Sequence, residues 1–366
     1  MHVLITADTV GGVWTYTREL TCGLVARGHR VTLVSFGRIP APGQAFWVHR
    51  NNLDYRPTAF PLEWMEDAQD GIARSIEYLT GIIEETRPDI LHFSQFCYGA
   101  LPQSLPKVVV AHSDVVSWWN AVHGDEPARS AWLEWYRDIV SRGLSGADAV
   151  VAPSRWMLDT LRGFYELPLR CSVIYNGRSE GLFRASDAKS DCVLSVGRIW
   201  DEAKQIRLLL ERRHNVPVKI AGAIHHPGRD GSDGWKLQLP GDFRFCGEQG
   251  EDQMRELYAD SATYVATSRY EPFGLAPVEA ALSRCALIVN DIPVFHELWG
   301  DTAFYFDRND ADSLARAIRL LSEFSSLRQL LGDLAYERAR SQFDSARMTT
   351  QYENLYRVLT GKSEAA

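Results

Sequence analysis

Residues 262–282 read ATYVATSRYEPFGLAPVEAAL, which has the pattern of a strand, a turn and a helix in that order. ATYVATS is apolar and β-branched like a buried strand, EPFG supplies the turn, and LAPVEAAL has the composition of a helix. Pro277 is tolerated there because it would lie in the first turn of that helix. A strand that leads into a helix through a short loop is the repeating unit of an α/β fold.

The same alternation extends along the rest of the chain. HVLITA at 2–7 reads as a strand, and a helical stretch follows at 13–28. Such alternation predicts doubly wound parallel sheets that helices cover on both faces. The other predicted strands lie at 31–36, 89–94, 107–113, 149–154, 192–197, 218–223, 243–247, 263–268, 285–290 and 303–307.

The length of the chain indicates two domains, because 366 residues exceed the size at which one core usually keeps growing. Between the two sets of strands, 169–191 holds a short β-run, an Asn-Gly pair and a polar stretch without periodicity. We expect one Rossmann-like domain at 1–180 and a second at 181–346, facing each other across a cleft. An amphipathic helix in 347–366 could pack on either domain.

The composition is that of an ordinary soluble enzyme, with 45% hydrophobic and 23% charged residues. A net charge of −8 without any basic run argues against nucleic-acid binding and against a polybasic membrane anchor. The N-terminus lacks the pattern of a signal peptide, and no apolar stretch is long enough for a transmembrane helix. The six cysteines include no CxxC pair and predict reduced thiols. We therefore expect a cytoplasmic protein.

The loop DTVGGVW at 8–14 follows the first predicted strand. Gly11 and Gly12 would let backbone amides approach an anion at a helix N-terminus. The loop has no third glycine, and the second strand ends in Ser-Phe-Gly at 35–37 where a nicotinamide site needs an acidic residue. The pattern excludes a dehydrogenase, and leaves an anion site or a plain tight turn.

Two loops of the second half carry charged residues. Arg198 and Lys204 lie beyond the strand at 192–197, where two cations could neutralise a diphosphate or could be solvated surface charges. Glu271 and Glu279 lie on either side of the amides that begin the next helix, a site for an anion. The two carboxylates could accept hydrogen bonds from a polyhydroxyl ligand, or could be a helix cap and an exposed helix acid.

The stretch SRYEPFGL-x3-EA resembles the E-x7-E motif of retaining nucleotide-sugar glycosyltransferases with the GT-B fold, specifically glycosyltransferase family four. The Arg-to-Lys interval is one residue longer than the commonest form, and SRCALIVNDIPVF replaces the usual Gly-rich turn. The resemblance implies an α/β fold of two Rossmann-like domains. Its other motifs are the Gly-Gly loop, AHS at 111–113, APSRWMLDTL at 152–161, VIYNG at 173–177, VGR at 196–198, FCGEQ at 245–249 and the segment 291–318.

The resemblance also implies a role for each residue. Glu279 would bind the ribose hydroxyls and Glu271 the hydroxyls of the donor sugar. Arg198 and Lys204 would neutralise the departing diphosphate, and His112 would be directed at the donor sugar. Amides of the two Gly loops would cover the phosphates and sugar, and the stretch from Arg244 would contact the base. The further donor-binding residues are Gly11, Gly12, Arg244, Phe245, Cys246, Phe273, Gly274 and Leu275.

The implied activity is retaining transfer of a sugar from a nucleotide diphosphate sugar to an acceptor hydroxyl, in glycan or glycoconjugate biosynthesis. A UDP-sugar is favoured over a GDP-sugar, the acceptor would be a carbohydrate or a small molecule, and no metal or separate cofactor is needed. Two alternatives stay open. One is a sugar phosphorylase or nucleotide-sugar epimerase of the same fold, and the other is a non-catalytic subunit that binds sugar nucleotides.

Three other features have both a structural and a functional interpretation. Asp310 and Asp312 form a DxD pair, which could hold a metal but is better placed to cap the following helix. His225 and His226 are more readily explained by a Gly-rich loop than by a metal site. An aromatic group could stack on an acceptor sugar but is better explained by core packing; its members are Trp118, Trp119, Trp132, Trp135 and Tyr136.

Overall fold

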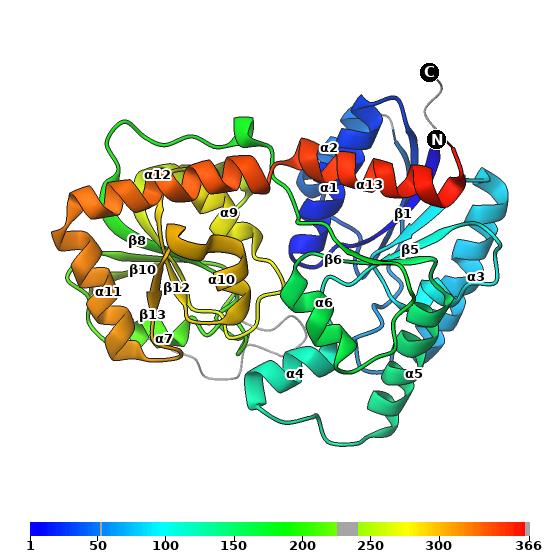
Figure 1. Ribbon diagram of the computed structural model, residues 1–366, viewed down its shortest axis with the longest axis horizontal. Coiled ribbons are helices and arrows are strands. Elements are labelled where there is room, and N and C mark those ends of the chain that lie inside the picture. The colour runs from blue at the N-terminus through cyan, green and yellow to red at the C-terminus, as the bar shows by residue number, and fades with distance from the viewer. Residues whose placement is uncertain (52, 225–240, 363–366) are drawn as a thin grey trace. The chain divides into compact units, whose positions relative to one another are not determined.

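The computed structural model describes residues 1–51, 53–224 and 241–362, and the chain divides into two compact units (Figure 1). The second unit begins at Arg178, close to the boundary expected at 180. The C-terminal helix groups with the first unit. The first unit comprises Met1–Asn120, Asp125–Gly177 and Ser345–Ala366, and the second comprises Ala121–Gly124 and Arg178–Asp344.

The described residues of the first unit form a seven-stranded parallel sheet in the order β3-β2-β1-β4-β5-β6-β7. The order proceeds outward from β1 in both directions, so right-handed crossovers place helices on both faces, as predicted. The strands are β1 (His2–Asp8), β2 (Arg30–Phe36), β3 (Asp54–Pro57), β4 (Ile90–Phe93), β5 (Lys107–Val110), β6 (Ala149–Ala152) and β7 (Cys171–Val173).

The C-terminal helix completes the core of the first unit. It packs along the first helix, and its side chains Met348, Tyr352 and Tyr356 are buried against Val3 and Ile5 of β1. The helices of this part of the chain are α1 (Gly12–Ala26), α2 (Pro42–Arg50), α3 (Gln69–Thr86), the 3-10 helix η1 (Cys97–Ala100), α4 (Val115–His123), α5 (Ala131–Gly146), α6 (Arg155–Arg162) and α13 (Ser345–Thr360).

The sheet differs from the prediction at its two edges. The sequence did not predict β3, whose residues Asp54–Pro57 are polar and only partly buried. The short β-run that we assigned to a linker is the edge strand β7, Cys171–Val173, which pairs with β6. Edge strands are short and half-covered, so they lack the apolar runs that identify the central strands.

The described residues of the second unit form a six-stranded parallel sheet in the order β10-β9-β8-β11-β12-β13. This order also proceeds outward in both directions from a central strand, β8, which makes the sheet doubly wound. The strands are β8 (Ser190–Val196), β9 (Val218–Ala221), β10 (Phe243–Gly247), β11 (Ser261–Ala266), β12 (Ala286–Asn290) and β13 (Phe304–Phe306).

One face of this sheet packs against α7 and α11, where Leu208 and Ile318 join the core formed by Val218 and Ile288. The helix predicted from LAPVEAAL is α9, with the bounds expected from the sequence. The helices are η2 (Glu180–Leu182), α7 (Arg207–Leu210), α8 (Glu251–Asp260), α9 (Leu275–Leu282), α10 (Pro293–Trp299), η3 (Gly300–Thr302), α11 (Ala311–Glu323) and α12 (Ser325–Gln342).

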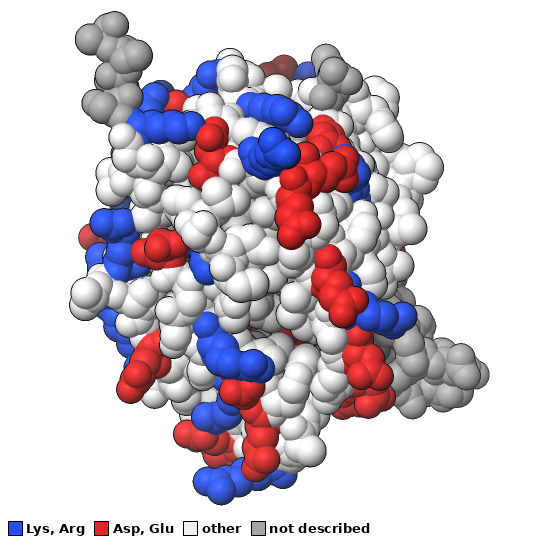
Figure 2. Space-filling view, turned by 90° about the vertical axis from the view of Figure 1, so that its right-hand side faces the viewer, with Lys and Arg blue, Asp and Glu red and all other residues white. Residues whose placement is uncertain are grey.

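The surface carries charges of both signs. On the face in Figure 2, Lys and Arg side chains are interspersed with Asp and Glu, and no broad basic area covers the described residues. Helices long and apolar enough to span a bilayer are also absent from the described parts of the chain.

Candidate functional site

The charged residues of the second unit lie on loops at one edge of its sheet. β8 and β11 are neighbouring parallel strands, so the loops that follow them leave the sheet on the same side. Arg198 and Lys204 belong to the loop after β8, and Glu271 to the loop after β11. The carboxyl edge of a doubly wound sheet is where such folds bind ligands.

Glu271 and Lys204, which the sequence assigned to different parts of a donor, contact each other directly. The Lys204 Nζ lies 2.5 Å from the Glu271 Oε2, which also accepts a hydrogen bond from the Ser268 hydroxyl at 3.0 Å. The Thr267 hydroxyl donates to the Lys204 carbonyl at 2.7 Å. The two loops are thus joined by a charged pair and by a backbone contact that fixes the lysine.

The backbone at Gly274 permits the approach of Glu271 to α9. Gly274 has a φ of 89°, and a Cβ there would lie 3.1 Å from the Glu271 Cγ. A larger residue would therefore be strained and would push the glutamate. Phe273 is buried and packs edge-on against Phe343, with ring centroids 5.3 Å apart, and Leu275 begins α9.

Arg198 is held by an aspartate that the sequence analysis missed. Its guanidinium lies 2.5 Å from the Asp201 carboxylate and stacks over Trp200, whereas 41% of its side chain remains exposed. Asp201 is buried and also accepts a hydrogen bond from the Ala203 amide at 3.0 Å. Asp201 therefore orients the arginine and shapes the loop that carries Lys204. An acid three residues after the arginine was the available signal.

Glu279 lies on α9 and pairs with a second residue that the sequence analysis missed. The Arg178 Nε is 2.9 Å from the Glu279 Oε1, and the two side chains are 3% and 16% exposed. Arg178 comes from the segment that we interpreted as a polar linker. No local pattern identified it, because the pair joins segments far apart in the sequence.

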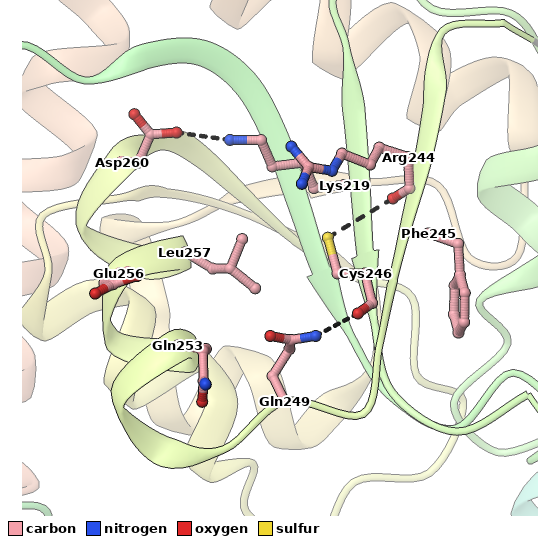
Figure 3. A pocket seen from close by; sticks show the side chains of 9 residues that line it. All are labelled: Lys219, Arg244, Phe245, Cys246, Gln249, Gln253, Glu256, Leu257 and Asp260. Carbon is pink, nitrogen blue, oxygen red and sulfur yellow. Dashed lines mark hydrogen bonds and ion pairs between the residues drawn. The ribbon is translucent and has the colours of Figure 1, made fainter.

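The stretch Arg244 to Cys246 is part of β10, and its side chains alternate between the two faces of the sheet. Phe245 packs against the core shared with α7 and α11. Arg244 and Cys246 face the other way, toward a pocket of about 420 Å³ beside α8 (Figure 3). Lys219 and Asp260 form an ion pair at 2.6 Å in its lining. Side chains from only one face of β10 can therefore reach a ligand in this pocket.

In the first unit, Gly11 lies between β1 and α1. It has a φ of 77° and open space around its Cβ position, and α1 begins at Gly12. The Val10 amide donates to the Asp8 carboxylate at 2.6 Å, which shapes the same loop. Positive φ explains a glycine at position 11.

His112 lies just beyond β5, which ends two residues earlier than predicted, at Val110. Its ring packs edge-on against Tyr16, with centroids 4.5 Å apart. Burial lowers the pKa of His112 to about 3, so the imidazole is neutral at neutral pH. Its Nε2 has no hydrogen-bond partner among the described residues. A neutral ring can both donate to and accept from a hydroxyl group.

Asp310 has the structural role that we favoured, because its carboxylate caps α11 by accepting from the Asp312 and Ser313 amides. Asp312 pairs with Arg212 at 2.5 Å. Groups of three or more His, Cys, Asp or Glu side chains that could hold a metal ion are absent from the described ranges. His225 and His226 lie outside those ranges.

The aromatic group is explained at least in part by packing, as favoured. Tyr136 is fully buried, and its hydroxyl donates to Asp114 at 3.1 Å. Trp132 stacks on Tyr136 and donates to the Met65 carbonyl. Trp119 donates to Asp125.

Two family models match the chain, one in each half. The model described as Glycosyltransferase Family 4 matches residues 10–179, and the one described as Glycosyl transferases group 1 matches residues 184–338. Two doubly wound domains with these matches define a glycosyltransferase of the GT-B fold. The chain belongs to glycosyltransferase family four.

Similar curated proteins include bacterial mannosyltransferases. The O-antigen chain mannosyltransferase RfbU of Salmonella typhimurium is 26% identical over 52% of this chain and 55% of its own length. The lipopolysaccharide core biosynthesis mannosyltransferase LpcC of Rhizobium leguminosarum bv. viciae is 32% identical over 60% of this chain and 66% of its own length. The chain therefore spans little more than half to two thirds of these relatives.

Solved structures match over nearly the whole chain and support the fold. Sucrose-phosphate synthase from Thermosynechococcus elongatus has a TM-score of 0.81 at 19% identity, covering 99% of this chain and 100% of the other. HepE from Anabaena, in complex with UDP-glucose, has a TM-score of 0.75 at 18% identity, covering 97% and 99%.

Proposed function

We propose that the protein is a retaining glycosyltransferase that transfers a sugar from a nucleotide diphosphate sugar to an acceptor hydroxyl. The observation that carries the proposal is the contact between Glu271 and Lys204, beside the loop that carries Arg198. This arrangement combines two cations with a buried carboxylate at the carboxyl edge of a doubly wound sheet.

The residues would divide the work as follows. Arg198 and Lys204 stabilise the negative charge that develops on the leaving diphosphate. Glu271 accepts hydrogen bonds from the donor sugar, and its contact with Lys204 joins sugar recognition to leaving-group stabilisation. Glu279 accepts hydrogen bonds from the ribose, and neutral His112 bonds to a sugar hydroxyl. Catalysis comes from alignment and electrostatics, and the two cations take the role that a metal has in other glycosyltransferases.

The comparisons support two donor classes. HepE was crystallised with UDP-glucose, which supports our preference for a UDP-sugar. Several curated relatives are mannosyltransferases by name, which makes GDP-mannose the second donor to test. We propose a carbohydrate or small-molecule acceptor, used in glycan or glycoconjugate biosynthesis.

The experiment begins with a donor screen by thermal shift, because a ligand at about 100 times its Kd stabilises a protein by roughly 2.7 kcal/mol. Transfer is then measured by mass spectrometry with the stabilising donor and an acceptor panel. Glu271→Ala and Arg198→Ala are expected to abolish most transfer while retaining the fold.

Arg328→Ala is the matched control, because Arg328 pairs with Asp191 near the start of β8, at the opposite edge of the sheet from the binding loops. Wild-type transfer rates in folded Glu271→Ala and Arg198→Ala variants would refute the proposal. Turnover that requires inorganic phosphate would indicate a phosphorylase, and donor conversion without an acceptor would indicate an epimerase. Donor binding without turnover would indicate a non-catalytic subunit.

A further inference from the structure

Arg178 is a buried arginine whose guanidinium meets a carboxylate of the candidate site. Its side chain is 3% exposed, and its Nε lies 2.9 Å from the Oε1 of Glu279. A buried charge is retained in a folded protein only where a partner compensates it. Glu279 supplies that compensation from α9, so the two side chains form one charged unit.

The backbone around Arg178 is fixed, which makes the position of its guanidinium definite. The Arg178 amide donates to the Phe343 carbonyl at 2.8 Å, and Arg178 forms a parallel β-bridge with Asp344. The chain then makes the short helix η2 and returns Phe183 beneath the guanidinium, with 5.1 Å from the Cζ to the ring centroid. An aromatic face under a cation adds to its stabilisation.

A buried phenol lies on the same side of α9. Burial, followed by the negative charge of Glu279, raises the pKa of Tyr258 well above its ordinary value. The Tyr258 ring also packs edge-on against Phe183, with centroids 6.5 Å apart. Glu279 is therefore surrounded by a cation, two aromatic rings and little water, so its carboxylate cannot choose its orientation freely.

We propose that Arg178 is a positioning and specificity-determining residue, which holds the Glu279 carboxylate so that the pair distinguishes a ribonucleotide from a nucleotide without ribose hydroxyls. This inference rests on the proposed function, in which Glu279 accepts hydrogen bonds from the ribose. Arg178 acts through Glu279 and need not touch the ligand. The bound chemistry is a vicinal diol, since one carboxylate can accept from two neighbouring hydroxyls.

The alternative is that Arg178 only anchors the segment 178–183 to the second unit. That role predicts a loss of stability on substitution and an equal effect on every nucleotide. The proposed role predicts an effect confined to nucleotides that carry the ribose hydroxyls. The two roles are separated by a thermodynamic cycle in which one change is made in the protein and the other in the ligand.

The experiment measures the affinity of the full chain for UDP, GDP and their 2′,3′-dideoxy analogues by calorimetry. The wild type is expected to prefer the ribonucleotide by about 10- to 100-fold, as hydrogen bonds to a charged group allow. Arg178→Ala should lose most of this preference by weakening the ribonucleotide, with the dideoxy affinity almost unchanged. Arg178→Lys should restore part of it.

Three further measurements complete the design. Arg328→Ala, which removes an arginine of the same unit at the far edge of the sheet, should keep the full preference. In transfer assays, Arg178→Ala should raise the donor KM more than it lowers kcat, because the pair binds the ribose and not the departing phosphate. If Arg178→Ala does not fold, Arg178→Lys carries the test, since a lysine cannot reproduce the fixed guanidinium geometry.

The outcomes distinguish this inference from the function on which it rests. If the wild type binds neither UDP nor GDP, the proposed function fails and the inference fails with it. If the wild type prefers the ribonucleotide and Arg178→Ala, or Arg178→Lys where the alanine variant does not fold, keeps that preference unchanged, only the inference is overturned.

Discussion

Replacing Gly274 with alanine should weaken binding of the donor sugar through Glu271. At φ 89° and ψ 87° an alanine is strained, which costs about 1–3 kcal/mol. The new Cβ would also lie 3.1 Å from the Glu271 Cγ and 3.4 Å from its Cδ. Those contacts are relieved only if the glutamate moves by a few tenths of an ångström, away from the geometry in which it meets Lys204.

The expected result is selective. Glu271 is proposed to contact the sugar and not the nucleotide, so Gly274→Ala should weaken UDP-glucose, or GDP-mannose if that is the donor, by about tenfold or more. The affinity for the free nucleotide diphosphate should change little. Both affinities are measured by calorimetry, and the stability is measured as the urea midpoint.

Gly28 provides the matched control. It has a φ of 80° and open space around its Cβ position, so Gly28→Ala introduces comparable backbone strain without touching Glu271. Both variants should be less stable than the wild type, and only Gly274→Ala should lose sugar-nucleotide affinity. The reasoning is refuted if Gly274→Ala is folded and binds the sugar nucleotide as tightly as the wild type.

Three further predictions follow from single contacts. Lys204→Met should lower kcat by about 100-fold or more in steady-state transfer assays, because it removes a cation from the leaving diphosphate; an unchanged kcat would assign that role elsewhere. Burial lowers the pKa of His92 and of His112 to about 3, so below pH 6.5 the unfolded chain binds more protons than the folded one. Stability should therefore fall as the pH decreases from 6.5 toward 3, and the urea midpoint of His112→Gln should fall less over that range. Asp310→Ala should cost about 1 kcal/mol of stability by removing the α11 cap, whereas donor affinity stays at the wild-type value; a loss of donor affinity would favour the metal interpretation.

The central elements of the fold could be predicted from the sequence because their signals are local. The strand, turn and helix of 262–282 appear as β11, a loop and α9, since apolar runs and Pro-Gly turns act over a few residues. The candidate site was only half predictable. Glu271 and Lys204 could be named individually, but their contact depends on two strands that the sheet brings together.

The missed residues share one physical cause. Arg178 was hidden in a segment without periodicity, and its role depends on a helix about a hundred residues later. Asp201 looked like an ordinary loop acid until its contacts with Arg198 and the Ala203 amide were seen. Pairs of this kind are selected by tertiary geometry, which leaves no mark in the local sequence pattern.

The division of the chain has a consequence for how the protein is made. The first unit takes its helix α13 from the end of the chain, and Met348, Tyr352 and Tyr356 are part of its core. A ribosome must therefore produce the whole second unit before the first can close its apolar interior. N-terminal domains commonly fold first during synthesis. Here the order is reversed, because the continuous second unit can finish while the earlier segment still waits for its last helix.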